Sequence, residues 1–441
     1  MNEPLPATPP ASLPRASACP GLLRIVAARD GGLCRVKLAG GALSAAAATQ
    51  VAEAAMRHGS GMVELTNRAN LQLRGIAPAA EGPLVASLMA AGLGPAAPAA
   101  DDVRNLMLSP MAGLDPNAAL DPRPLAKALL EALEQQPRYH QLSPKFAMQV
   151  DAGERLAELR HAHDVWLSPL WFEGRLYMGL GLANAIAGTC PVAAVPVEHA
   201  AALVLGVLDR FLALAGPAPG RMRELLQTVP VSALLEGLDV PLRREGLVPV
   251  TARSRPLPLG LHAQQQPDRV AVGVAPPLGR LTAVRLLGLA RLAQAEGIGE
   301  LRLTPWQGLL IPGVAQARAT AVQAKARELG LLADPGEPLA SLVACTGSVG
   351  CARGLADTKA DALALAAALG RPLSVHLSGC GRSCAQASVA PVTLLAVRPG
   401  HYDLFFREPM ASGFGRVAGR DLTLHEAAAQ LAACPRSAFD D

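Results

Sequence analysis

Four of the eight cysteines in this 441-residue chain fall close together near its C-terminal end. Cys345 and Cys351 form a C-x5-C pair in ACTGSVGCARG, and Cys380 and Cys384 form a C-x3-C pair in HLSGCGRSCAQ. Four thiolates from two loops match the ligands of a 4Fe-4S cluster. A structural zinc site is the main alternative, although zinc sites favour tighter pairs of the C-x2-C to C-x4-C kind. The spacing therefore favours an iron–sulfur cluster.

Small residues surround these cysteines. Gly347, Gly350, Gly379 and Gly381 would let backbone N–H groups approach the cluster sulfurs, and such hydrogen bonds tune a reduction potential. His376 lies on the predicted strand SVHL, and we expect a buried histidine satisfied by a neighbour rather than a metal ligand. The remaining cysteines are scattered, and we expect them to be buried or incidental thiols; they are Cys19, Cys34, Cys190 and Cys434.

Composition limits the function classes. The formal net charge is only +4 and no long basic run occurs, so nothing indicates nucleic-acid binding. The apolar stretch AALVLGVLDRFLALAG is interrupted by Asp209 and Arg210, so we expect no membrane span. Residues 1–18 are rich in Pro, Ala and Ser and lack the apolar core of a secretory signal, which predicts a disordered tail. Sparse, clustered cysteines indicate a reducing, cytoplasmic protein.

Two segments of the chain repeat at a constant offset of 238 residues. The first begins GGALSAAAATQ and the second PLGRLTAVRLL, and each predicts a strand, a capped amphipathic helix, a Gly-x-Gly turn and a further strand. Ser44 and Thr282 are the predicted caps. The copies differ where Arg68 of the first aligns with Trp306 of the second. We infer a duplicated frame of which one copy serves a site and the other supports it.

A longer α/β stretch follows each copy, so the order is small unit, large unit, small unit, large unit. The two small units would pair through complementary sheet edges and close the molecule around a pseudo-twofold axis. A cleft between the halves is then the natural ligand site.

Over nearly its whole length the chain resembles the sulfite and nitrite reductase superfamily, through the two cysteine motifs and LTNRANLQLRG. Within it the chain is most similar to the precorrin-3B synthase branch, in DGGLCRVKLAGG, ELTNRANLQLRG, ACTGSVGCARG and HLSGCGRSCAQ. The resemblance implies a mixed α+β fold with two ferredoxin-like half-domains and two larger α/β domains. The ranges we expect are 19–80 and 255–320 for the half-domains, 95–240 for the first large domain and 335–436 for the cluster domain.

The resemblance also implies site residues. Arg68 and Arg104 match the arginines that hold anionic substrate in the reductases, and Lys145 in LSPKFAMQV matches their first lysine. We therefore expect these three residues to be catalytic. Ala147 stands where the reductases carry a second lysine or an asparagine, which argues against reductase activity.

The reaction implied is that of an oxygen-dependent monooxygenase of aerobic cobalamin biosynthesis. It converts precorrin-3A to precorrin-3B by hydroxylation at C20 with closure of a γ-lactone. A mononuclear non-haem iron is expected beside the cluster, and precorrin-3A would occupy the cavity where the reductases keep sirohaem, so no sirohaem is expected. Two alternatives stay open, a sirohaem-dependent sulfite or nitrite reductase and a non-catalytic cluster protein that carries electrons or senses redox state.

Burying the acetate and propionate groups of such a substrate requires arginine or lysine partners. The candidates lie in or beside the matched motifs and are Arg35, Arg68, Arg74 and Arg104. Arg68 and Arg74 are six residues apart on a predicted strand, so we expect both side chains on one face.

The remaining expectations concern metal ligands and electron supply. Candidate iron ligands include His140, His161, His163 and His401, but no 2-His-1-carboxylate spacing stands out, and we expect His161 and His163 to be exposed. Gly179 and Gly181 lack the third glycine of a dinucleotide fingerprint, and we expect a turn there that approaches the tetrapyrrole carboxylates. Without a visible nicotinamide or flavin site, electrons would come from an external donor, NADH through a reductase or a ferredoxin.

Overall fold

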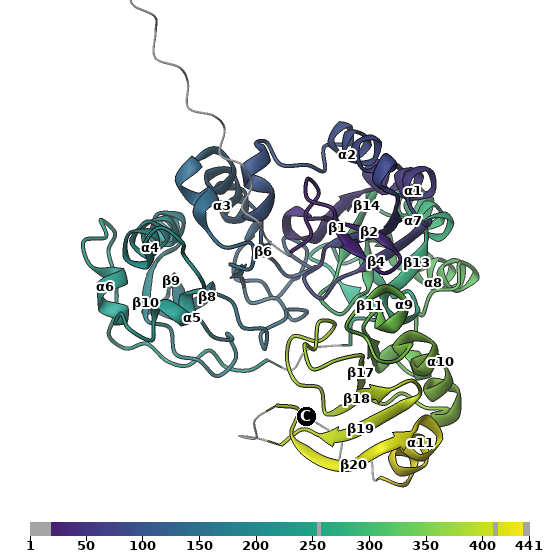
Figure 1. Cartoon of the computed structure of the whole chain (residues 1–441). Coiled ribbons are helices and arrows are strands. Elements are labelled where there is room, and N and C mark those ends of the chain that lie inside the picture. The colour runs from purple at the N-terminus through teal and green to yellow at the C-terminus, as the bar shows by residue number, and fades with distance from the viewer. Residues whose placement is uncertain (1–18, 254–256, 409–412, 435–441) are drawn as a thin grey trace, which may run out of the picture.

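The structure, a computed structural model, describes residues 19–253, 257–408 and 413–434, so the predicted tail 1–18 lies outside it. Its strands form four five-stranded sheets, with helices packed against them (Figure 1). The mixed α/β class and the duplicated architecture are confirmed.

The bounds of the helices and strands follow the two repeated units. The helices are α1 (Ala45–His58), α2 (Glu81–Ala90), α3 (Arg123–Gln135), α4 (Ala200–Ala215), α5 (Met222–Leu225), α6 (Val231–Leu235), α7 (Ala283–Glu296), α8 (Ala319–Glu328), α9 (Gly347–Gly350), α10 (Thr358–Leu369) and α11 (Leu424–Ala433). The strands of the first half are β1 (Val26–Ala28), β2 (Gly31–Val36), β3 (Ala42–Ser44), β4 (Met62–Leu65), β5 (Leu71–Ile76), β6 (Leu106–Met107), β7 (Met148–Val150), β8 (Val165–Phe172), β9 (Arg175–Leu182) and β10 (Ala193–Pro196). Those of the second half are β11 (Gly260–Ala263), β12 (Arg269–Val274), β13 (Arg280–Thr282), β14 (Glu300–Leu303), β15 (Leu309–Ala315), β16 (Leu342–Ala344), β17 (Val375–Ser378), β18 (Val392–Arg398), β19 (His401–Phe406) and β20 (Arg416–Thr423).

The two small units have the same internal structure. Ser44 and Thr282 cap α1 and α7, each accepting a hydrogen bond from a backbone N–H three residues on, as predicted. Both helices end in the predicted Gly-x-Gly turn, in which Gly61 and Gly299 share a φ of 72° that favours glycine. The duplication therefore extends to backbone conformation.

The small units exchange strands. β13 of the second unit pairs with β4 of the first, and β3 of the first pairs with β14 of the second. The resulting sheets have the orders β1-β2-β5-β4-β13 and β11-β12-β15-β14-β3. Helices α1 and α7 lie side by side, and one apolar core contains residues of both units. This exchange is the predicted pairing through complementary edges.

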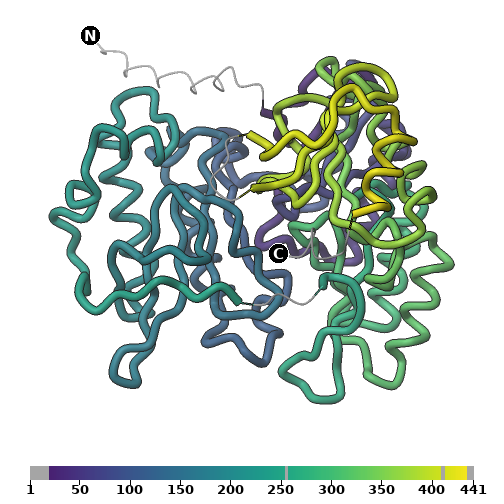
Figure 2. Tube along the Cα trace, turned by 90° about the horizontal axis from the view of Figure 1, so that it is seen from below, coloured from purple at the N-terminus to yellow at the C-terminus, as the bar shows by residue number. Residues whose placement is uncertain are grey.

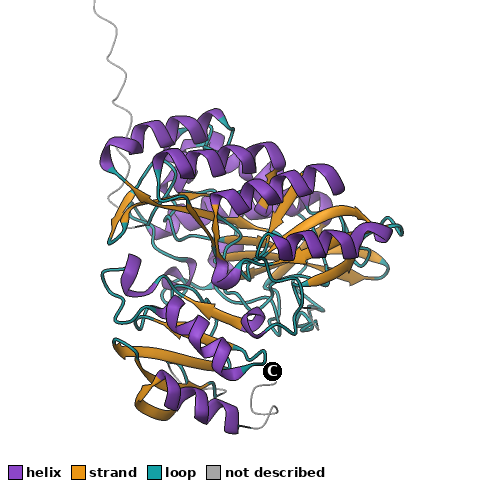
Figure 3. Cartoon of the chain, turned by 90° about the vertical axis from the view of Figure 1, so that its right-hand side faces the viewer, coloured by secondary structure: helices purple, strands orange, loops and turns teal. Residues whose placement is uncertain are grey.

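The two large units repeat a second pattern. In each, three parallel strands are followed by two antiparallel ones, giving the orders β10-β9-β8-β7-β6 and β16-β17-β18-β19-β20. Each unit has its own apolar core. Seen from below, the first large unit forms one lobe, in blue and teal, beside a second lobe that contains the rest of the chain (Figure 2). In Figure 3 the helices lie as layers over the strands.

Two further observations complete the fold. Among the described residues, no helix combines the length and apolar character needed to cross a membrane. Gly179 and Gly181 lie within β9, not in a turn, so the prediction of a ligand-approaching turn there was wrong. A Cβ on Gly181 would lie 1.9 Å from the Trp166 ring, so this glycine serves the packing of β9 on β8.

Candidate functional site

Two neighbouring parallel strands deliver the four clustered cysteines. Cys345 follows β16, and Cys351 follows the short helix α9. Cys380 and Cys384 follow β17, which pairs in parallel with β16. Because the carboxyl ends of parallel strands meet at the same edge of a sheet, the two loops lie together.

The contacts around the thiols show this convergence. The Gly379 N–H donates a hydrogen bond to Cys345 Sγ at 3.2 Å, as expected for a residue that lets backbone approach a cluster sulfur. Burial raises the pKa of the Cys384 thiol, and the nearby Cys380, Cys345 and Cys351 raise it further. All four thiols are therefore within electrostatic reach of one another.

These thiols fit a cluster better than a single ion. Among the described residues, no three His, Cys, Asp or Glu side chains converge closely enough to hold one metal ion. A tetrahedral zinc site would require such a group, whereas the thiolates of a 4Fe-4S cluster bind different irons and lie further apart. The arrangement would place one cysteine sulfur at each corner of such a cluster.

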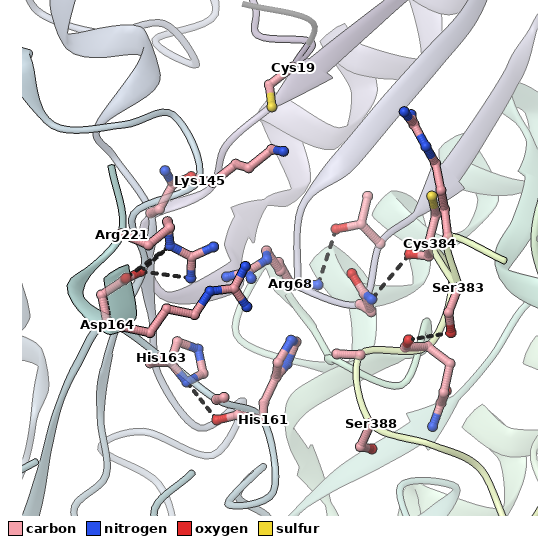
Figure 4. Close-up of a pocket in the computed structure, with 18 of the residues that line it drawn as sticks. Cys19, Arg68, Lys145, His161, His163, Asp164, Arg221, Ser383, Cys384 and Ser388 are labelled. Carbon is pink, nitrogen blue, oxygen red and sulfur yellow. Dashed lines mark hydrogen bonds and ion pairs between the residues drawn. The ribbon is translucent and has the colours of Figure 1, made fainter. Parts of the chain in front are cut away.

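A cavity of about 720 Å³ lies against Cys384 (Figure 4). Its walls come from the first small unit, the first large unit and the loop after Cys380. Among the described residues, one carboxylate, Asp164, lines it, together with six cationic side chains; these are Arg35, Arg68, Lys145, Arg221, Arg223 and Arg382. The cavity is therefore strongly cationic.

Arg68 projects from a turn rather than from a strand. The Thr66 hydroxyl accepts hydrogen bonds from the backbone N–H groups of Arg68 and Asn70, and Ala69 adopts a φ of 53°. The turn sends Arg68 into the cavity while Arg74 stays on β5, so the prediction that both share one face was wrong.

The Arg68 guanidinium is half-buried in the cavity wall. Among the described residues it has no hydrogen-bond or ion-pair partner; desolvation together with Arg221 lowers its pKa to about 10, and Asp164 acts against that fall. A partly desolvated guanidinium without an acceptor is unfavourable unless an anion completes the site.

Arg221 is fixed in place by Asp164. Its Nε lies 2.9 and 2.8 Å from the two carboxylate oxygens, and Asp164 also accepts the backbone N–H groups of Met222 and Ala147. Asp164 is 1 % exposed, so this is a buried fork that aims a guanidinium at the cavity (Figure 4).

His161 and His163 are buried on the cavity wall, so the prediction that they are exposed was wrong. Their rings lie next to each other, with centroids 5.2 Å apart (Figure 4). Burial and the nearby Arg68 lower the pKa of His161 to about 3 and that of His163 well below its ordinary value. Both rings are therefore neutral near pH 7. Because His163 Nδ1 donates to the His161 carbonyl, its Nε2 is an acceptor, and that atom is buried without a partner in the described part of the chain.

Two other predicted residues line the cavity. The Lys145 side chain is exposed there, and its ammonium has no hydrogen-bond or ion-pair partner among the described residues. Arg35, on β2, donates to the Gln72 amide oxygen at 2.9 Å, while its Nε is buried and finds no partner in the residues that the structure describes. Ala147 is buried and presents no polar side chain at its position.

Arg74 and Arg104 do not line the cavity. Arg74 donates to both Asp30 carboxylate oxygens and, at 2.9 Å, to the Gly350 carbonyl in the cysteine loop. Arg104 donates to the backbone carbonyls of Gly94 and Lys37 and thereby ties the first large unit to the first small unit. Both side chains therefore hold parts of the fold together, and neither is placed to bind a substrate in the cavity.

Three of the scattered cysteines and His376 were also singled out in the sequence. Cys19 lines the cavity, Cys34 is buried and Cys190 is exposed. His376 lies buried on β17 as expected, but its Nε2 has no partner within the described ranges, so the prediction that a neighbour satisfies this ring was wrong for that atom.

A tryptophan occupies the position in the second repeat that is equivalent to Arg68. Trp306, which aligns with Arg68, donates from its indole N–H to Glu158 at 2.8 Å and packs on Met111 and Leu310. The predicted asymmetry thus places a cation in the cavity in the first repeat and a partly buried, hydrogen-bonded tryptophan in the second.

Several cavity residues could not be found from the sequence. Arg221 and Arg223 come from the far end of the first large unit, and Arg382 lies between the last two cysteines. Arg382 carried a signal, since it stands inside the C-x3-C motif. Asn67, in the turn before Arg68, donates to the Cys384 carbonyl at 3.3 Å and joins the two sides of the site.

Comparison with known proteins gives the family. The "Nitrite/Sulfite reductase ferredoxin-like half domain" matches residues 27–91 and 262–329, and the "Nitrite and sulphite reductase 4Fe-4S domain" matches residues 99–245. The second match covers the first large unit, which contains none of the four clustered cysteines.

Relatives and a solved structure agree. The chain is 28% identical over 391 residues to a precorrin-3B synthase of Sinorhizobium sp, covering 88% of this chain and 82% of the relative. It is 29% identical to a chloroplastic ferredoxin–nitrite reductase of Zea mays, covering 82% and 68%. The NirA protein of Mycobacterium tuberculosis has the same fold, with a TM-score of 0.75 at 22% identity over 91% of this chain and 79% of that one. The chain therefore belongs to the nitrite and sulfite reductase family.

Proposed function

We propose that the chain is an oxygen-dependent monooxygenase that converts precorrin-3A to precorrin-3B. One atom of O2 enters the substrate at C20 as a hydroxyl group, with closure of a γ-lactone, and the other leaves as water. Two electrons and two protons balance this reduction. An external donor supplies the electrons, NADH through a reductase or a ferredoxin.

The observation that carries this proposal is the excess of unpaired cations in the cavity beside Cys384. Arg68 and Lys145 have no partner among the described residues, and six cationic side chains face one carboxylate. A tetrapyrrole bearing acetate and propionate groups supplies the anions that these side chains lack.

Each cavity residue has its own role in this proposal. Arg68, Arg35 and Arg221 would bind substrate carboxylates, and Asp164 keeps Arg221 oriented. Lys145 would bind a carboxylate or deliver a proton where the cavity is open. The neutral imidazole of His161 would donate or accept one hydrogen bond without adding charge.

The iron–sulfur cluster would be held by Cys345, Cys351, Cys380 and Cys384. When bound, it supplies electrons one at a time, which is what activation of triplet O2 requires. The cavity residue nearest to it is its own ligand Cys384, so electrons would have a short path to a bound substrate.

A mononuclear non-haem iron does not fit the described residues. No group of three or more histidine, cysteine or carboxylate side chains among them could ligate one ion. The two histidines that line the cavity lie beside Arg68, whose charge opposes a cation there. We therefore derive no step through such an iron.

A sirohaem-dependent nitrite or sulfite reductase is the second candidate. It is favoured by the reductase relatives, whose identity matches that of the synthase relative, and by the presence of Arg68 and Lys145 in the cavity. Ala147 weighs against it, because its methyl group can neither hold nitrite or sulfite nor donate a proton.

The test is turnover of the full chain. Protein reconstituted anaerobically with iron and sulfide is given precorrin-3A, a reductant and 18O2, and the product is analysed by mass. We expect one labelled oxygen atom per product molecule and none with a Cys384→Ala variant, while Cys190→Ala, at an exposed cysteine, stays active. Unchanged precorrin-3A together with nitrite or sulfite reduction would support the second candidate instead.

A further inference from the structure

A buried group of charges lies beneath the loop that carries Cys345 and Cys351, outside the cavity. Strand exchange builds it, because Arg280 on β13 is registered opposite Glu64 on β4. The Glu64 carboxylate is 6 % exposed, lies 2.6 Å from Arg280 and 3.5 Å from Arg74, and accepts from the Thr346 hydroxyl at 3.2 Å. Both repeats thus contribute to one charge cluster under the cysteine loop.

Carboxylates balance the two arginines of this cluster. Arg280 is paired with Glu64, and Arg74 is paired with Asp30 at 2.8 Å in addition to Glu64. Two positive and two negative groups therefore offset one another.

Lys359 differs from these two arginines in its contacts. It lies in the first turn of α10, and its ammonium donates to the carbonyls of Leu278 at 2.6 Å and Ala344 at 3.3 Å. No described carboxylate lies within ion-pair distance of it. Burial is the main reason that its pKa falls to about 8, and Glu64 and Cys345 act against that fall.

With Arg280 and Arg74, Lys359 gives this cluster three cations against the two carboxylates Glu64 and Asp30, and such an excess of charge at a partly buried place is unfavourable unless a further anion completes it. Ala344, whose carbonyl Lys359 contacts, directly precedes Cys345. A 4Fe-4S cluster with four thiolate ligands is anionic, and each electron that it accepts makes it more so. Nearby positive charge therefore favours the reduced form and raises the reduction potential.

We propose that Lys359 is an electrostatic tuning residue that raises the reduction potential of the cluster held by Cys345, Cys351, Cys380 and Cys384. This inference rests on the cluster assigned under the proposed function. Lys359 contacts neither the cavity nor the substrate, so it acts on the electron supply and not on substrate binding.

The test is a redox titration of the cluster in the full-length, anaerobically reconstituted protein at pH 7, followed by absorbance and by EPR of the reduced form. K359M is compared with wild type, with K359R, which keeps the charge, and with K127M, which removes an exposed lysine from α3. We expect K359M to disfavour reduction at least tenfold, a shift of 59 mV to lower potential for a one-electron couple. K359R and K127M should titrate with wild type.

A K359M cluster that titrates with wild type would overturn the inference. A second measurement covers poor cluster retention by K359M. The cluster-free K359M protein should unfold at the same temperature as cluster-free wild type or higher, since a partly buried charge is gone. A lower unfolding temperature would show a purely structural role and overturn the inference. Failure of wild type to take up iron and sulfide would instead refute the proposed cluster itself.

Discussion

At the scale of single residues, the site is defined by charges that lack partners. Arg68 and Lys145 face the cavity without an acceptor among the described residues, whereas Arg74 and Arg104, equally prominent in the sequence motifs, donate to carboxylate or backbone oxygens outside the cavity. Motif position alone could not separate these two pairs. The separation depends on which carbonyls and carboxylates lie nearby after folding.

Arg68 is expected to strengthen ligand binding at a cost to the stability of the ligand-free protein. Arg68→Met should weaken anaerobic binding of precorrin-3A at least tenfold, since a charge-assisted hydrogen bond contributes about 1.5–3 kcal/mol. The same change should leave the thermal stability of the ligand-free protein equal or higher, because it removes an unpaired, partly buried charge. Arg57→Met, at an exposed position on α1, serves as the control for both measurements. Tight binding by Arg68→Met would mean that the carboxylates lie elsewhere.

Glu154 predicts a pH dependence of folding. This carboxyl is fully buried, and burial together with Asp151 raises its pKa from 4.5 to about 8. The folded state therefore keeps a proton that the unfolded state loses above about pH 4.5. Its contribution to stability is complete below that pH and is lost as pH rises towards 8, with a slope of at most about 1.4 kcal/mol per pH unit.

The measurement is the unfolding midpoint of wild type and Glu154→Gln between pH 5 and 8. Wild type should lose stability relative to the variant as pH rises, because glutamine stays neutral throughout. Parallel curves for the two proteins would show that Glu154 is ionised in the fold.

At the scale of elements, the repeat made the helices and turns of the two small units predictable. The cap residues, the helices and the Gly-x-Gly turns recur at the same offset in sequence and in structure, because local capping and periodicity determine them. The turn before Arg68 was not predictable, since Ala69 adopts a left-handed conformation that its residue type does not signal. The burial of His161 and His163 was not predictable either, because the segments that cover their loop are distant from it in the sequence.

β9 offers a test of packing at this scale. Gly181→Ala should destabilise the first large unit by about 1–3 kcal/mol, since the new methyl group meets the buried Trp166 ring. Gly82→Ala, in open space on α2, should leave stability unchanged or slightly raised. Thermal unfolding followed by Trp fluorescence compares the two. Equal stabilities would show that β9 shifts to admit the side chain.

At the scale of the whole molecule, duplication provides two equivalent positions, and the two copies carry different residues there. The first repeat contributes Arg68 to a cationic cavity, whereas the second carries Trp306, which packs on an apolar cluster. The cysteines come from the second large unit and most of the cations from the first half, so the site exists only when both halves assemble.

The central claim is that a tetrapyrrole enters this cavity as substrate and is not held there as a prosthetic group. The most direct measurement is the pigment content of the protein purified without oxygen, followed by titration with precorrin-3A. We predict cluster absorption alone in the purified protein and then the binding of one equivalent of precorrin-3A. A stoichiometric amount of extractable sirohaem, with no capacity for precorrin-3A, would contradict the account.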